Sequence, residues 1–213
     1  MKTALVAGAT GLIGNQVVDL LIADPAYNKI ICLSRKPLKH NIDKVKVIET
    51  DVDYLNDIAE LIKADEVFCC LGTTMKKAKT KDAFKKVDFD YPLLLAQIAK
   101  QNGARGFHLV SALGASAKSS IFYNRIKGEI EEEISNIGFE SFHIYRPSLL
   151  LGPRSEERSG ESAAKIFFKL FGFLVPRKYR PIDSLKVAKS MLYYSNSSLT
   201  GIAVHESQSM QSI

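Results

Sequence analysis

The stretch TALVAGATGLIG at residues 3–14 decides the fold of this 213-residue chain. It opens with an apolar run at residues 4–7, which predicts a short buried strand that leads through a turn into a helix. Gly8 allows a sharp turn, Gly11 allows a phosphate to approach the backbone, and Gly14 allows the helix to pack closely on the strand. Because the N–H groups at such a helix start attract anions, the stretch predicts a dinucleotide-binding turn.

Apolar runs and helical patterns alternate along the rest of the chain, which predicts an α/β fold of the Rossmann type with a doubly wound parallel sheet. The expected strands are residues 4–7, 30–33, 45–49, 66–71, 106–110, 139–145 and 201–205. The expected helices are residues 12–22, 55–63, 93–100, 121–137, 163–171 and 184–194. We expect one domain over residues 1–213, with a small C-terminal annex for substrate, mainly residues 150–200.

Composition narrows the class of protein. The net charge of +6 suits an acidic cofactor, and we expect no nucleic-acid partner because no basic motif has interleaved aromatic residues. No stretch reaches the ~18 to 20 apolar residues of a membrane span, so we expect no membrane insertion. The three cysteines and four histidines lack metal-ligand spacing, so no metal site is predicted. Lys2 and the apolar run after it resemble a secretory signal, but three glycines interrupt the run, and we expect a cytoplasmic protein.

The end of the second expected strand indicates which dinucleotide binds. NAD-preferring sites usually carry an acidic residue there, which bonds the ribose 2′-hydroxyl. This chain has Ser34, Arg35 and Lys36 instead, and a guanidinium can hold a 2′-phosphate in a bidentate manner. We therefore expect NADP(H) to be preferred over NAD(H), although a solvated basic turn would have the same sequence.

Further cofactor contacts are expected at the carboxyl ends of the other strands. Asp51 follows the third strand and is placed to accept from the adenine amino group, or to cap the next helix. The small-residue turn after the fourth strand would let the cofactor pass close to the sheet. The expected cofactor-binding residues, two of which (Pro147 and Leu149) rest on the resemblance described below, are Gly8, Thr10, Gly11, Leu12, Ile13, Arg35, Lys36, Asp51, Val52, Leu71, Gly72, Thr73, Lys127, Pro147 and Leu149.

Ser111, Tyr123 and Lys127 are the candidate catalytic residues. Tyr123 and Lys127 are four residues apart on one expected helix and so share a face, and Ser111 ends the preceding strand. Because the ordinary tyrosine pKa is near 10, a cation one turn away is needed to favour the phenolate at neutral pH. We expect Tyr123 to exchange the proton, Lys127 to tune it and hold the nicotinamide ribose, and Ser111 to orient the substrate carbonyl or hydroxyl.

With these residues the chain resembles short-chain dehydrogenase/reductases of the extended or atypical kind. GATGLIG at residues 8–14 matches their nucleotide turn, and the segment from Arg146 to Pro153 is similar to the one that lines their nicotinamide side. FCCLGTT at residues 68–74 and RPSLLLG at residues 146–152 resemble the Tat-interacting oxidoreductase-like family more narrowly. That resemblance implies a short, single-domain, NADPH-binding protein.

Asp88 departs from the pattern of the extended and atypical short-chain dehydrogenase/reductases. Those proteins often have an asparagine at this position, which helps to relay protons. The expected function is an NADPH-dependent oxidoreductase that reduces a small carbonyl compound. The alternatives are a cofactor-binding regulatory or redox-sensing protein with weak turnover, and an enzyme like the NDP-sugar epimerases, against which the short annex counts. A protein partner or a homodimer is compatible with each of these three functions.

Two basic segments leave alternatives open. The lysine-rich run at residues 76–86 is typical of a solvated loop and helix start, but it also follows the fourth strand, where it could attract an anionic substrate. Residues 165–180 are basic and apolar, which fits a membrane-surface segment, but packing of the annex or a subunit contact explains them more simply.

Overall fold

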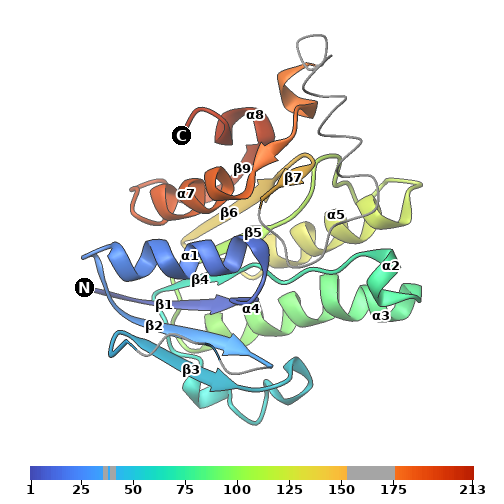
Figure 1. The fold of residues 1–213 in the computed structure, drawn as a ribbon. Helices are drawn as coiled ribbons and strands as arrows, with labels where there is room; N and C mark the ends of the chain where they lie inside the picture. The colour runs from blue at the N-terminus through green and yellow to red at the C-terminus, as the bar shows by residue number, and fades with distance from the viewer. Residues whose placement is uncertain (36–37, 39–41, 153–175) are drawn as a thin grey trace.

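The computed structural model describes residues 1–35, 38, 42–152 and 176–213, and these form a parallel sheet covered by helices on both faces (Figure 1). The seven strands are paired in the order β3-β2-β1-β4-β5-β6-β9, and every pair is parallel. The strands are β1 (Lys2–Ala7), β2 (Tyr27–Ser34), β3 (Val45–Glu49), β4 (Glu66–Cys69), β5 (Gly106–Val110), β6 (Ser141–Arg146) and β9 (Gly201–Glu206). The strand order reverses between β1 and β4, which is where ligands bind in doubly wound folds.

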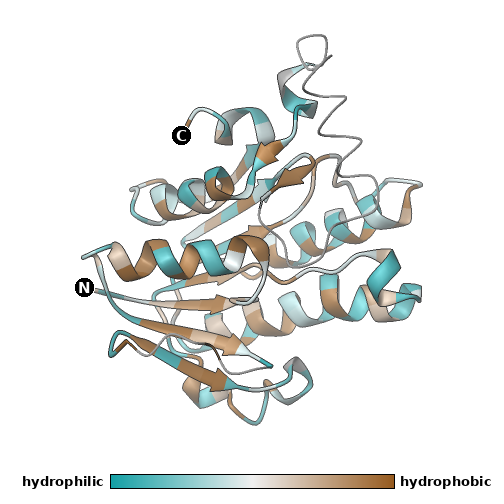
Figure 2. Ribbon diagram, viewed as in Figure 1, coloured by the Kyte–Doolittle hydropathy of each residue, from teal (hydrophilic) through white to brown (hydrophobic). Residues whose placement is uncertain are grey.

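The helices divide between the two faces of the sheet. The α-helices are α1 (Leu12–Ala23), α2 (Met75–Ala78), α3 (Lys81–Lys85), α4 (Tyr91–Gln101), α5 (Phe122–Ser135), α7 (Ser184–Ser195) and α8 (Ser207–Met210). Apolar residues of α4 and α5 pack on one face of the sheet, and those of α1, α7 and α8 pack on the other. Figure 2 shows the hydrophobic colour concentrated on the strands and on the helix sides that meet them. The predicted α/β Rossmann class is therefore confirmed.

Alternation along β1 shows how the sequence produces these two cores. Leu5 and Ala7 belong to the core under α4 and α5, whereas Ala4 and Val6 belong to the core under α1 and α7. All four are buried, so the strand is apolar on both faces, as a central parallel strand must be.

The helix predicted at residues 55–63 is replaced by two short 3₁₀ turns, η1 (Val52–Tyr54) and η2 (Ala59–Leu61). Residues 51–57 contain four Asp or Asn side chains, which compete with helical hydrogen bonds for the backbone. Leu55 and Ile62 still reach the core, so the turns bury the same apolar groups without a regular helix.

The helix predicted at residues 93–100 belongs to a longer helical run. It begins at α3, where the hydroxyl of Thr80 accepts from the backbone N–H of Ala83 at 3.1 Å, and continues to the end of α4. Between α3 and α4 lies a π-helical turn, η3 (Lys86–Asp90). Such turns are rare and occur frequently at functional sites.

The C-terminal part contains elements that the sequence pattern did not reveal. β7 (Leu150–Leu151) and β8 (Ile182–Asp183) form a second, two-stranded parallel sheet, and η5 (Arg177–Tyr179) precedes β8. The helix expected at residues 163–171 lies outside the described residues. Within the described part of the chain, no helix is both long enough and apolar enough to span a bilayer.

Candidate cofactor and active site

The glycine turn has the close contacts that its three glycines predict. Gly8 has φ +83°, and a Cβ there would lie 2.7 Å from the carbonyl oxygen of Cys70. A Cβ on Gly14 would lie 2.1 Å from the carbonyl oxygen of Gly8, so α1 packs directly on the turn. In the described structure no side chain caps α1 at Gly11, which leaves the first N–H groups of the helix, including those of Leu12 and Ile13, for a bound anion.

A small hollow of about 100 Å³ lies beside this turn, at the carboxyl ends of β1, β2 and β3. Three of the predicted cofactor residues line it: Thr10, Arg35 and Leu71. The rest of the lining is mostly small or apolar, and consists of Ala7, Leu33, Ser34, Thr50, Leu55 and Leu95. A partly apolar hollow next to a backbone anion site suits the adenosine end of a dinucleotide, and the exposed side chain of Arg35 lies at its edge.

Three other residues are predicted at this end of the site, and the structure describes them only in part. Asp51 follows β3, and its carbonyl accepts from the backbone N–H of Tyr54 at 3.0 Å. Val52 begins η1, but its side chain lies outside the described structure, as does the whole of Lys36.

A buried ion pair lies at the carboxyl ends of β4 and β5, beside the crevice that a doubly wound sheet has where its strand order reverses. The ammonium of Lys127 lies 2.8 Å from Asp88 Oδ1, and the two side chains are 5% and 1% exposed. The other Asp88 oxygen accepts from the backbone N–H of Thr73 at 2.8 Å. A Cβ on Gly72 would lie 4.0 Å from the Lys127 ammonium, so the turn after β4 passes directly beside it. Burial alone would lower the pKa of Lys127, but Asp88 and Tyr123 outweigh it, and the pKa of Lys127 is raised.

Tyr123 lies one helical turn before Lys127 on α5, as predicted. Its ring is half-buried and packs against Phe84, with the ring centroids 5.6 Å apart. The structure therefore brings Tyr123 and Lys127 together with the turn after β4.

Ser111 lies at the end of β5, and its hydroxyl donates to the carboxylate of Glu131. Glu131 also accepts from Arg146, at 3.1 Å from Nε and 2.5 Å from Nη2. Because Glu131 is two turns beyond Tyr123, about 12 Å along the helix, the serine hydroxyl faces a different turn of α5 from the phenol.

Sequence reasoning did not name Glu131, and it named Arg146 only as the start of the segment similar to the one that lines the nicotinamide side in the short-chain dehydrogenase/reductases. A signal was present, because Tyr123, Lys127 and Glu131 are spaced i, i+4 and i+8 on one helix face. Glu131 is 4% exposed, and a buried carboxylate requires a partner. In the structure that partner is the guanidinium at the end of β6.

The two remaining predicted residues follow β6. The carbonyl of Pro147 accepts from the backbone N–H of Leu113 at 3.0 Å, which ties this segment to the loop after β5. The carbonyl of Leu149 accepts from Ile182 at 2.9 Å, and its side chain is 39% exposed.

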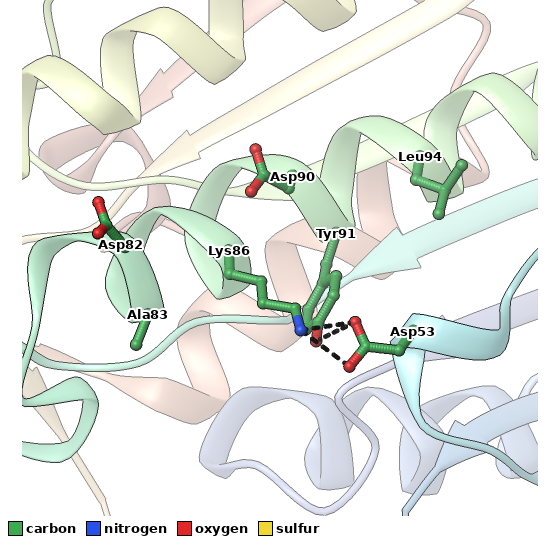
Figure 3. Close-up of a pocket in the computed structure, with 7 residues that line it drawn as sticks. All are labelled: Asp53, Asp82, Ala83, Lys86, Asp90, Tyr91 and Leu94. Atoms are coloured by element: carbon green, nitrogen blue, oxygen red, sulfur yellow. Dashed lines mark hydrogen bonds and ion pairs between the residues drawn. The ribbon is translucent and has the colours of Figure 1, made fainter.

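A larger hollow of about 470 Å³ lies elsewhere, on the outer side of the helical run (Figure 3). Its lining is Asp53, Asp82, Ala83, Lys86, Asp90, Tyr91 and Leu94, and includes none of the predicted site residues. Asp53 accepts there from the Lys86 ammonium at 2.8 Å and the Tyr91 hydroxyl at 2.9 Å. This hollow is an exposed charged surface, separate from the crevice. Among the described residues, no group of three or more His, Cys, Asp or Glu could hold a metal ion.

The sheet order, the glycine turn and the crevice define a dinucleotide-binding protein of the Rossmann type. Residues 4–167 match the model of the NAD dependent epimerase/dehydratase family, and the chain belongs to that family. The family and the fold are those of NAD(P)-dependent enzymes.

Two relatives support the narrower resemblance to the Tat-interacting oxidoreductase-like proteins. Protein HTATIP2 of Rattus norvegicus is 34% identical over 78% of this chain and 70% of its own length. Protein FMP52, mitochondrial, of Candida albicans is 32% identical over 93% of this chain and 90% of its own length.

Solved structures agree in fold. A UDP-N-acetylglucosamine 4-epimerase from Methanobrevibacter ruminantium M1 superposes with a TM-score of 0.74 at 19% identity, over 96% of this chain and 76% of that one. The Bordetella bronchiseptica enzyme WbmH in complex with NAD⁺ superposes with a TM-score of 0.74 at 16% identity, over 97% of this chain and 76% of that one. At these identities the likeness shows the fold alone.

The expectation of a cytoplasmic protein is wrong. Relatives from Candida albicans, Emericella nidulans and Candida glabrata are named mitochondrial, which contradicts it. The expectation rested on assigning the N-terminal apolar run to a strand, and that assignment holds, because the run is β1. A strand assignment carries no information about the compartment.

Proposed function

We propose that this protein is an NADPH-dependent reductase of a small carbonyl compound. One observation carries the proposal: a buried ammonium, that of Lys127, stands one helical turn from a half-buried phenol, Tyr123, in the crevice of a dinucleotide fold. This arrangement suits proton transfer to a carbonyl oxygen, because the cation stabilises the phenolate that the transfer leaves behind.

In this proposal the nicotinamide supplies the hydride, and the chain's own residues position the reactants and move the proton. Tyr123 donates its hydroxyl proton to the substrate oxygen. The Lys127 ammonium stabilises the phenolate and donates to the ribose hydroxyls. For Ser111 to orient the substrate carbonyl, its hydroxyl would have to donate to the substrate oxygen in place of Glu131, because a carbonyl oxygen only accepts hydrogen bonds.

The preference for NADPH is also part of the proposal. Arg35 lines the hollow at the end of β2, where NAD-preferring sites carry a carboxylate. A guanidinium at this position can pair with a 2′-phosphate, which NAD lacks. Gly8 and Gly11, with the N–H groups at the start of α1, would hold the pyrophosphate.

The experiment is to titrate the purified protein with NADPH and with NADH by fluorescence, and then to assay aldehydes, ketones and quinones. We expect tighter binding of NADPH and turnover that falls about 10²-fold or more in Tyr123→Phe, the size of a general acid–base contribution. Tight NADPH binding with no turnover by the wild type on a broad panel would count against a reductase.

A second candidate is a cofactor-binding regulatory protein with weak turnover. The Asp88–Lys127 ion pair favours it, because a carboxylate beside the ammonium offsets the charge that would act on Tyr123. Such a protein would bind a protein partner differently in its NADPH and NADP⁺ states, and a pull-down in each state distinguishes it from the reductase.

A third candidate, a nucleotide-sugar epimerase, draws support from the family description and from the UDP-sugar enzymes of similar fold. It would require NAD⁺ that remains bound through purification. Mass spectrometry of the cofactor released from the protein decides this point.

A further inference from the structure

Asp88 is a buried carboxylate beside Lys127 that the structure holds from two sides and that the proposed reaction does not use. It lies in the π-helical turn η3 and is 1% exposed. One carboxylate oxygen accepts from the backbone N–H of Thr73, and the other meets the ammonium of Lys127, both at 2.8 Å. The carboxylate therefore connects the turn after β4 to α5.

The π-helical turn explains how Asp88 reaches this position. An α-helix placed continuously from α3 to α4 would present its residues at 100° intervals, and the wider turn at η3 changes that phase locally. Lys86 begins this turn and Tyr91 follows it, and both side chains donate to Asp53 (Figure 3). The run is thus anchored on its outer side while Asp88 faces the crevice.

The surroundings of Lys127 show what the carboxylate supplies. The charged or titratable groups around the ammonium are Asp88 from η3, Tyr123 from α5 and Cys69 from β4, and the backbone carbonyl of Val110 lies at 3.4 Å. Burial raises the pKa of Cys69 to about 11, so this thiol is neutral at physiological pH. Among the groups of the described chain that act on the ammonium, Asp88 is the carboxylate that contacts it.

We propose that Asp88 is a positioning residue, which fixes Lys127 in the crevice and keeps it charged where the nicotinamide ribose binds. This rests on the proposed placement of that ribose at Lys127. A neutral amide in the same place could hold the geometry but not the charge, because a buried ammonium without a counter-ion loses its proton readily. The carboxylate thus secures cofactor binding over a wide range of pH.

The test compares NADPH affinity across pH in Asp88→Asn and in a matched control, Asp90→Asn. Asp90 lies in the same turn but is half exposed and pairs only loosely with Lys85, at 3.8 Å. We expect the wild type and Asp90→Asn to bind NADPH with an affinity that is constant within about threefold from pH 7 to 9.5. In Asp88→Asn we expect the affinity to fall about tenfold or more over that range, the change that follows loss of one charge-assisted hydrogen bond.

A loss of affinity that is equal at every pH would overturn the proposal, because it would indicate a packing role alone. No loss at any pH would overturn it as well. If Asp88→Asn does not fold, the double variant Asp88→Asn/Lys127→Met decides: folding of the double variant supports the proposal, because it removes the uncompensated ammonium, and failure of both contradicts it. All of these experiments measure cofactor binding or folding, and none measures turnover. A wild type without turnover would therefore contradict the proposed reductase but not the proposed role of Asp88.

Discussion

The hydroxyl of Ser111 donates to the buried carboxylate of Glu131. Arg146 pairs with the same carboxylate from the end of β6 and also reaches Glu206 on β9 at 3.4 Å. The pairing with Glu131 raises the pKa of Arg146. This network joins the ends of β5, β6 and β9 to α5, and thereby sets the position of the helix that carries Tyr123.

Removing the charge of Glu131 should destabilise the fold. We expect Glu131→Gln to lower the free energy of unfolding by about 2 to 4 kcal/mol, because Arg146 and Ser111 lose a shared buried partner. Ser111→Ala should cost about 1.5 kcal/mol, because it removes one hydrogen bond to a charged group while Arg146 stays paired with the carboxylate. Urea denaturation measures both. Glu133→Gln, at an exposed position of the same helix, is the control and should change stability by less than about 0.5 kcal/mol.

The close contact at Gly14 leaves no room for the methyl group of an alanine. We expect Gly14→Ala to lower the free energy of unfolding by about 2 kcal/mol or more, because backbone atoms cannot move away from the new Cβ. It should also weaken cofactor binding.

Gly138→Ala is the matched control for this prediction. Its φ is +81°, but nothing lies within 4 Å of the new Cβ, so only the left-handed backbone conformation is penalised, by about 1 kcal/mol. If the two variants lose the same free energy of unfolding, the close contact at Gly14 does not add to the cost of the substitution.

Arg35 should decide between the two nicotinamide cofactors. We expect Arg35→Ala to raise the Kd for NADPH about 10- to 100-fold, because a charge-assisted pair with the 2′-phosphate is lost, while the Kd for NADH changes less than about threefold. Lys29→Ala is the control, since Lys29 is an exposed cation near the other end of β2. Equal weakening of both cofactors in Arg35→Ala would remove the case for NADPH preference.

Acid should destabilise the protein through two buried histidines. His143 and His205 are 3.0 Å apart between Nδ1 and Nε2, and burial lowers the pKa of His143 to about 3 and of His205 to about 4. In the unfolded chain both titrate near 6.5. The unfolded state therefore binds more protons between these values, so the stabilisation is complete above about pH 6.5 and is lost as the pH falls toward 4.

The measurement is urea denaturation at intervals from pH 7.5 to 4.5. We expect the free energy of unfolding to decline with falling pH, and His205→Phe to reduce the slope by up to about 1.4 kcal/mol per pH unit, the value for one proton. Phenylalanine keeps an aromatic ring beside Tyr145 and Tyr194. If the substitution does not change the slope of the unfolding free energy against pH, groups other than His205 cause the loss of stability in acid.

Much of the fold could be predicted because its information is local. The central strands β1, β4 and β5 are runs of mostly buried apolar residues, and Gly11 and Gly14 are each required by a contact within the turn itself, with the carbonyl oxygen of Gly8. The i, i+4 spacing alone is likewise sufficient to place Tyr123 and Lys127 on one helix face. These features depend on residues that are close in sequence or that obey a fixed period.

The rest was decided by contacts between distant parts of the chain. Periodicity could not show that η3 is a π-helical turn, nor that Asp88 and Lys127, 39 positions apart, form a buried pair. Sequence spacing placed Ser111 shortly before the helix that carries Tyr123 but could not show that its hydroxyl faces Glu131, two turns away from the phenol. The physical reason is that a buried polar group must find its partner wherever packing places one, and only the tertiary structure determines that place.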